Sequence, residues 1–253
     1  MPRKIVIEWS FEPADYFEEE VVVESDEYNL RIDDGHAQVT LDPKFVDEVD
    51  KLMETFSADL ESRFLAVQLM THEPFHLSKA SRYDVKDDGT KHHYVKASIT
   101  AKSSTGTVDL ILLDADSNVV SDTKQDRIRK KRQFSEMAAK YGGLDKVLQQ
   151  MLRSYGAAVS DPDNEFVHLY EIRDTAKKKF GNDSKTKAAL NITKAEWNDF
   201  GRITCDEPLR QGRHRGQNIG SLRDATPQEL ERVRKIAAKI IENYMVYLDN
   251  QGT

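Results

Sequence analysis

The segment Lys4-Ile5-Val6-Ile7-Glu8-Trp9-Ser10-Phe11 alternates large apolar residues with smaller or polar ones. Ile5, Ile7, Trp9 and Phe11 occupy every second position, and successive side chains of a β-strand point to opposite faces. The segment therefore predicts a strand with one heavily apolar face, which another layer of structure must cover.

Further strands are expected directly after this one. Residues 20–24, 28–32 and 37–41 read as strands, and the last two flank the turn Asp33-Asp34-Gly35-His36 as a hairpin. Three or four antiparallel strands are therefore predicted before residue 45.

A long amphipathic helix is predicted next. Asp42 suits the N-cap and Pro43 the first helical position, where a missing N–H costs nothing. Apolar residues then recur at helical spacing up to about Met70, and this stripe should pack on the sheet. The stripe contains Phe45, Val49, Leu52, Met53, Phe56, Leu60, Phe64 and Leu65.

The strand pattern returns beyond Pro74. Residues 81–85 and 93–99 flank a turn at 87–89, and residues 108–113 and 119–120 flank a turn at 115–118. Residues 1–122 are therefore predicted to form an α+β domain with an antiparallel sheet and one long helix.

Residues 123–253 read as helical. Apolar stripes recur at helical spacing, and Thr193/Glu196 and Thr226/Glu229 have the spacing of capping boxes. One stripe is expected to begin at Leu144, and Gly181 follows another. The predicted fold class is α+β, with the N-terminal domain followed by a C-terminal α-helical bundle.

Composition limits the class of protein. Hydrophobic residues make up 38% and charged residues 32% of the chain, and the net charge is −7. This charge argues against a nucleic-acid binder that uses its whole surface, but it leaves room for a local basic patch. A single cysteine, Cys205, and the absence of a long apolar run indicate a cytoplasmic protein without a membrane span.

Arg210 and His214 are the candidate catalytic residues. If their segment is helical, residues four apart share one face. Arginine can stabilise negative charge at phosphorus and a neutral histidine can move a proton, as metal-independent RNA cleavage requires. The alternative is a basic helix end or loop that pairs with nearby acidic residues, namely Asp206, Glu207 and Asp224.

From about residue 145 the chain resembles a HEPN-like helical domain. Residues 166–173 resemble its early helix with a Leu-Tyr-x-x-Glu/Arg pattern, and residues 209–214 resemble its Arg-polar-x-x-x-His segment, with three residues between Arg210 and His214. The resemblance implies a homodimer in which the two segments meet, and ribonuclease activity in a defence or toxin-type system. The family also includes inactive members that bind RNA or dimerise.

Other residues around this segment are assigned by their charge. Glu171 and His168 are the candidate supporting side chains. Gly212 and Gly216 would let the backbone approach a phosphate, although a flexible loop explains them equally well. The predicted RNA- or phosphate-binding residues are Arg202, Arg213, Arg215 and Arg223.

Remaining motifs predict neither a metal nor a cofactor. Residues 72–76 match the His-Glu-x-x-His pattern of zinc-binding helices, with His72 and His76 as the two histidines. Pro74 between them disfavours the helix that this pattern requires. The basic run 124–132 could follow a nucleic-acid backbone, but a solvated helix face is the favoured interpretation. Acidic neighbours should raise the pKa of Cys205.

Two classes of protein therefore remain open. The first is an RNA- or nucleotide-phosphate-directed protein, with ribonuclease activity as its catalytic form. The second is a non-catalytic interaction protein whose bundle dimerises and whose N-terminal domain binds a partner chain.

Overall fold

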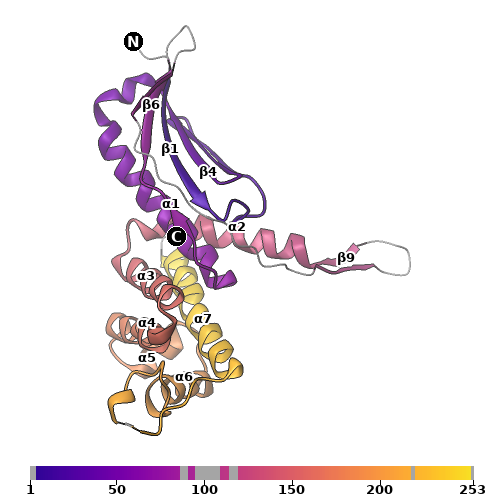
Figure 1. Ribbon diagram of the computed structural model, residues 1–253, viewed down its shortest axis with the longest axis vertical. Coiled ribbons are helices and arrows are strands. Elements are labelled where there is room, and N and C mark those ends of the chain that lie inside the picture. Colours follow the sequence, from indigo (N-terminus) through magenta and orange to yellow (C-terminus); the bar gives the residue numbers. More distant parts are fainter. Residues whose placement is uncertain (1–3, 86–90, 95–108, 114–118, 218–219, 252–253) are drawn as a thin grey trace. The chain divides into compact units, whose positions relative to one another are not determined.

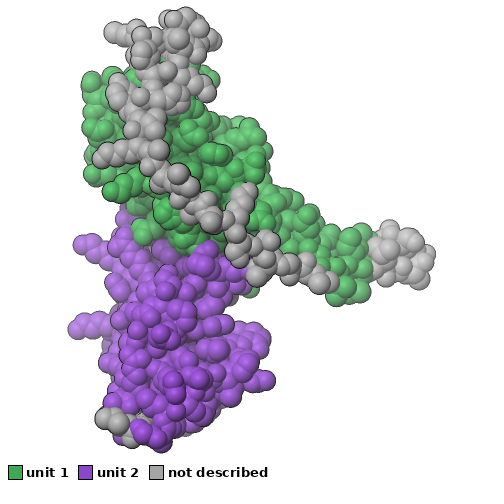
Figure 2. Space-filling view, in the orientation of Figure 1, with its two compact units in different colours: residues 1–61, 75–133 green, residues 62–74, 134–253 purple. Residues whose placement is uncertain are grey.

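The computed structural model describes residues 4–85, 91–94, 109–113, 119–217 and 220–251 (Figure 1). The chain is an α+β protein, as predicted. It divides into two compact units, residues 1–61 with 75–133 and residues 62–74 with 134–253 (Figure 2). The predicted division lay between residues 122 and 123. In the structure, unit 1 extends to residue 133, and residues 62–74 belong to unit 2.

Unit 1 contains an antiparallel sheet with the strand order β2-β3-β4-β1-β6-β7. The opening segment forms its strand β1 (Lys4–Glu12), which pairs with β4 and β6 and, at its end, with β5. Ile5, Ile7 and Trp9 are at most 1% exposed, which confirms the predicted apolar face. The other strands are β2 (Val21–Glu24), β3 (Tyr28–Asp33), β4 (His36–Leu41), β5 (His76–Leu77), β6 (Ser81–Val85) and β7 (Lys91–Tyr94).

The predicted long helix follows β4. Asp42 is the N-cap, and its carboxylate accepts a hydrogen bond from the backbone N–H of Lys44. The first turns are a 3-10 helix, η1 (Pro43–Glu48), which continues as α1 (Val49–Thr71). The indole N–H of Trp9 donates to Ser57 at 3.2 Å, so the first half of α1 packs on the sheet (Figure 1).

A separate two-stranded sheet confirms the predicted second hairpin. It consists of β8 (Ile111–Leu113) and β9 (Val119–Asp122). Large apolar side chains on it are 60–67% exposed, namely Leu110, Ile111, Leu112, Val119 and Val120. The predicted turns at 87–89 and 115–118, and residues 95–99 of the predicted strand, lie outside the described residues.

The second half of the chain is helical, as predicted. Its elements are α2 (Thr123–Gly142), α3 (Lys146–Ser160), η2 (Pro162–Asn164), α4 (Glu165–Phe180), α5 (Asp183–Ala189), α6 (Lys194–Gly201), the π-helix η3 (Arg202–Asp206), η4 (Arg215–Gln217) and α7 (Pro227–Gln251). Both capping boxes are confirmed, with reciprocal hydrogen bonds between Thr193 and Glu196 and between Thr226 and Glu229.

Aromatic residues from four helices fill the core of unit 2. Tyr155, Phe166, Trp197 and Tyr244 are each at most 1% exposed. Leu144, in contrast, is 84% exposed, so its assignment to the apolar stripe was wrong. The reason is that Asp145 caps α3, which leaves the preceding residue outside the helix. None of the helices in the described ranges is both long and apolar enough to cross a bilayer.

Candidate functional site

The predicted site segment lies in the loop between the π-helix η3 and helix α7. Backbone hydrogen bonds join its two ends, from the N–H of Arg210 to the carbonyl of Arg223 and from the N–H of Arg223 to Pro208. The N–H of Arg213 donates to the carbonyl of Thr204 in η3 at 2.8 Å. The backbone is therefore held in place at Arg210, Arg213 and Arg223, three residues that carry candidate side chains.

Arg210 and His214 do not lie on a helix. Both residues are in turns, so the condition under which they would share a helix face is not met. Arg210 forms an exposed ion pair with Asp224 at 3.7 Å, and the His214 side chain is exposed. Over the described ranges, no hydrogen bond or ion pair joins Arg210 to His214.

The two candidate supporting residues have other partners. Glu171 accepts a hydrogen bond from the hydroxyl of Ser154 at 2.9 Å, and the ring nitrogen Nε2 of His168 lies 3.2 Å from the carboxylate of Asp161. Neither is linked to Arg210 or His214 by a hydrogen bond in the described part of the chain. Both side chains are occupied within helices α3 and α4 and the turn between them.

All four predicted binding arginines have polar partners. Arg202 pairs with Glu207, Arg213 with Asp174 at 3.2 Å, and Arg223 with Glu229 at 2.7 Å, while Arg215 donates to Asn164 and to the carbonyls of Asp163 and Arg210. The side chains of Arg202, Arg213 and Arg223 remain 42–52% exposed. These guanidinium groups are therefore held in position while part of each still faces solvent.

Arg213 belongs to a chain of contacts between arginines and aromatic rings. Its guanidinium lies 4.5 Å from the ring centroid of Tyr170. The guanidinium of Arg173 lies 5.6 Å from the same ring and 4.4 Å from the ring of Trp197. Such cation–π contacts stabilise a guanidinium over a ring, and more so where water is excluded. We call Trp197, Arg173, Tyr170 and Arg213 the arginine–aromatic chain.

Gly201 lies against Arg173 of the arginine–aromatic chain. A Cβ atom at Gly201 would lie 2.1 Å from Nη1 of Arg173, too close for any real contact. Arg173 is only 13% exposed; its Nη1 donates to the carbonyl of Trp197 at 3.2 Å, and its Nη2 lies 3.6 Å from the carboxylate of Asp183. A side chain at this position of α6 would therefore displace the guanidinium of Arg173, and Gly201 avoids this.

An open pocket of about 460 Å³ lies beside the arginine–aromatic chain. Its lining consists of Tyr170, Arg173, Asn198, Asp199, Gly201, Arg202, Cys205 and Asp206. The π-helix η3 supplies three of these residues, and π-turns occur frequently at functional sites. Burial is the main cause that raises the pKa of Cys205, and Asp206 adds to it. The predicted direction was right, so the thiol is protonated and is a poor nucleophile.

A second polar cluster in unit 2 is more deeply buried. Glu165 is 2% exposed, and its carboxylate receives two hydrogen bonds from Arg234 at 2.6 and 2.8 Å. Nε2 of His72 lies 3.7 Å from the same carboxylate, and its Nδ1 lies 3.3 Å from the hydroxyl of Tyr155. His76 belongs to β5 in unit 1, so His72 and His76 do not share a helix.

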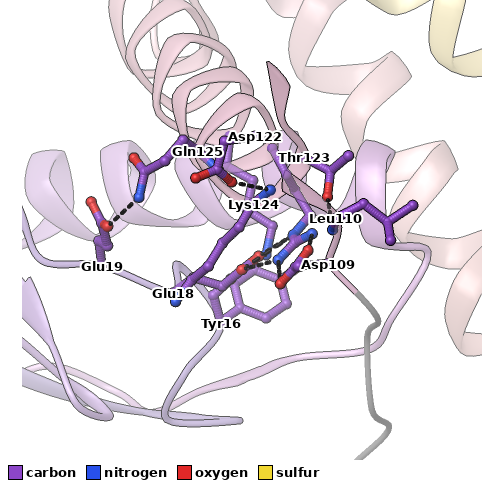
Figure 3. Close-up of polar contacts among 11 residues, drawn as sticks. Tyr16, Glu18, Glu19, Asp109, Leu110, Asp122, Thr123, Lys124 and Gln125 are labelled. Atoms are coloured by element: carbon purple, nitrogen blue, oxygen red, sulfur yellow. Dashed lines mark hydrogen bonds and ion pairs between the residues drawn. The ribbon is translucent and has the colours of Figure 1, made fainter. Parts of the chain in front are cut away.

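Part of the basic run 124–132 serves to attach α2 to the sheet unit. Figure 3 shows the polar contacts around Glu18 and Asp109. Lys131 is 6% exposed and donates to the carbonyl of Tyr16 and the carboxylate of Glu18, while Arg127 pairs with both Glu18 and Asp109. The favoured interpretation as a solvated face was therefore wrong at Lys131, although Arg129 is 76% exposed.

No protein-family model, curated protein or solved structure matches the chain. The site must therefore be interpreted from its own geometry. Sequence reasoning assigned Arg213 and Arg202 to the site but missed Arg173, Tyr170 and Gly201. The available signal was the spacing of Tyr170 and Arg173, which places both on one face of α4.

Proposed function

We propose that unit 2 binds RNA, through the pocket and the arginine-bearing loop beside it. The observation that carries the proposal is the position of Arg213. Its guanidinium is stacked on Tyr170, yet the side chain is 42% exposed. Single-stranded RNA is bound by such planar groups, which stack on bases, together with cations that contact phosphates.

The distribution of charge supports this assignment. Acidic residues outnumber basic ones in unit 1, whereas basic residues slightly outnumber acidic ones in unit 2. The excess of acidic residues that gives the chain its net charge of −7 therefore lies in unit 1. Unit 2 carries no net negative charge that would repel a polyanion. Binding should weaken with added salt, because each phosphate contact releases counterions.

RNA binding is tested with a labelled single-stranded oligomer and fluorescence anisotropy over a salt series. Arg213→Ala should weaken binding about 5- to 150-fold, the range expected for loss of one stacking group. Arg129→Ala is the matched control, because Arg129 is an exposed residue of unit 1 whose ion pair, over the described ranges, is with Asp126 of the same helix. Absence of binding at low salt, or equal losses in both variants, would refute the proposal.

Ribonuclease activity is the catalytic form of the same proposal, and exposure of Arg210 and His214 on one fixed loop supports it. His214 would accept the proton of a 2′-hydroxyl, whose oxygen then bonds to phosphorus. The 5′-oxygen of the next nucleotide leaves and takes up a proton, which yields a 2′,3′-cyclic phosphate, while Arg210 stabilises the charge. Cleavage of RNA without metal that persists in His214→Ala would exclude this role.

A place in a defence system rests on the HEPN-like resemblance alone.

The second candidate function is self-association without catalysis. The observation that favours it is the β8–β9 hairpin, at which Leu110, Ile111, Leu112, Val119 and Val120 are each 60–67% exposed. Successive residues of a strand point to opposite faces, so the hairpin exposes apolar side chains on both of its faces. A second copy that covered these side chains would remove their apolar surface from water. Light scattering should show a dimer that Leu112→Asp converts to a monomer; a wild-type monomer at all concentrations would exclude it.

A further inference from the structure

Two exposed polar residues of the pocket lining are available to a ligand, namely Asn198 and Asp206. Over the described ranges, neither the amide of Asn198 nor the carboxylate of Asp206 makes a hydrogen bond or an ion pair. Other polar groups of the lining are engaged: Asp199 pairs with Arg232 at 3.0 Å and Arg202 pairs with Glu207. The unengaged groups are therefore one carboxylate, which only accepts hydrogen bonds, and one amide, which donates and accepts.

The local structure brings these two residues to one pocket. Asn198 lies in α6, and the chain continues without interruption into the π-helix η3, whose last residue is Asp206. The wall beside them contains the Tyr170 ring, which the guanidinium of Arg173 contacts from within the fold. The pocket thus combines a planar wall with a pure acceptor and a donor, which is the set of groups that reads the edge of a nucleobase.

We infer that this pocket binds a guanine base. The Watson–Crick edge of guanine presents two adjacent donors, N1–H and the 2-amino group, and a carboxylate accepts both at once. The neighbouring O6 is an acceptor, which suits the amide NH₂ of Asn198. Adenine and cytosine each present a single amino donor beside an acceptor nitrogen, and uracil presents one N–H between two carbonyls. Guanine is therefore the base that satisfies Asp206 with two hydrogen bonds.

The inference rests on the proposed RNA binding and adds base selectivity to it. Arg213 contacts the same Tyr170 ring whose side chain lines the pocket, and its exposed guanidinium can receive the phosphate of the bound nucleotide. A bidentate contact discriminates between bases by about 1–3 kcal/mol, so guanine should bind roughly 5- to 150-fold more tightly than the other bases.

The test uses the full chain and labelled oligouridine that carries a single central G, A, C or inosine. The oligomer with G should bind most tightly, and inosine, which lacks the 2-amino group, should bind between G and A. Competition by GMP against AMP gives a second reading of the same preference. Asp206→Asn should reduce the preference for G over A to within about twofold.

The matched control is Asp199→Asn, which removes the same charge from the same pocket at a residue already paired with Arg232. Both variants lose one negative charge, so each gains general affinity for RNA, and the ratio of G to A is the decisive readout. Equal affinity for all four oligomers would overturn the guanine assignment and leave RNA binding standing. Failure of every oligomer and of GMP to bind would overturn both.

Discussion

His72 should make the stability of unit 2 depend on pH. The residue follows α1 with a left-handed backbone (φ 53°), and its ring lies against Tyr155 and near the Glu165–Arg234 pair. Burial is the main cause that lowers the pKa of His72 from 6.5 to about 4, and the charge of Arg234 lowers it further. The imidazole is therefore neutral in the folded protein at pH 7.

The direction of the effect follows from this depressed pKa. The unfolded chain, with a pKa near 6.5, takes up the proton first as the pH falls. Stability is therefore full above about pH 6.5 and decreases as the pH falls towards the folded pKa of about 4. The 2.5-unit difference corresponds to about 3 kcal/mol in total, of which about 2 kcal/mol is lost by pH 5.

Urea unfolding followed by circular dichroism at 222 nm measures this loss at pH 7, 6 and 5. His72→Asn is the test variant, because asparagine tolerates the left-handed backbone and does not titrate. Between pH 7 and pH 5 the wild type should lose about 2 kcal/mol more than the variant. His36→Asn serves as control, since that side chain is 63% exposed, and it should keep the wild-type slope. Parallel slopes for the wild type and His72→Asn would refute the assignment.

Three further substitutions test the packing of unit 2. Gly201→Ala places a methyl group 2.1 Å from Arg173 and should lower stability by about 1–3 kcal/mol, as thermal unfolding would show; an unchanged melting temperature contradicts the fit. Glu165→Gln leaves Arg234 without its charge partner and should cost up to about 3 kcal/mol in urea unfolding, whereas Glu231→Gln, on the exposed face of α7, should cost almost nothing. Asp145→Ala removes the N-cap of α3 and an acceptor of the Tyr244 hydroxyl, so a loss of about 1–2 kcal/mol is expected; a loss below the error of measurement would show that the cap contributes little.

The sequence predicted the elements whose signals are local. The alternation in β1, the N-cap at Asp42 and the two capping boxes are determined by residues within a few positions of one another, and the structure confirms each of them. The same reasoning failed at Leu144, because one capping residue decided where the helix begins. Local patterns therefore located helices and strands well but located their first residues less well.

The candidate site was less predictable, because its geometry depends on residues far apart in the sequence. Arg213 could be assigned from its charge, but its contact with Tyr170 joins a loop to a helix more than forty positions earlier. The conformation of residues 210–214 was likewise undetermined, since backbone hydrogen bonds to Thr204 and Arg223 hold it in turns. The HEPN-like resemblance stays a prediction, because no family model matches the chain.

Arg173 and Arg213 contact the same ring, that of Tyr170, but they differ in exposure and in their other partners. Arg173 is 13% exposed, and its guanidinium is already occupied by a carbonyl, a carboxylate and two rings, so a ligand could reach it only by displacing these partners. Its role is to fix the ring of Tyr170 from within the fold. Arg213 has one carboxylate partner, at 42% exposure, and a salt bridge in solvent contributes little that a phosphate could not replace. The inner arginine therefore provides the rigidity, and the outer one provides the contact available to a ligand.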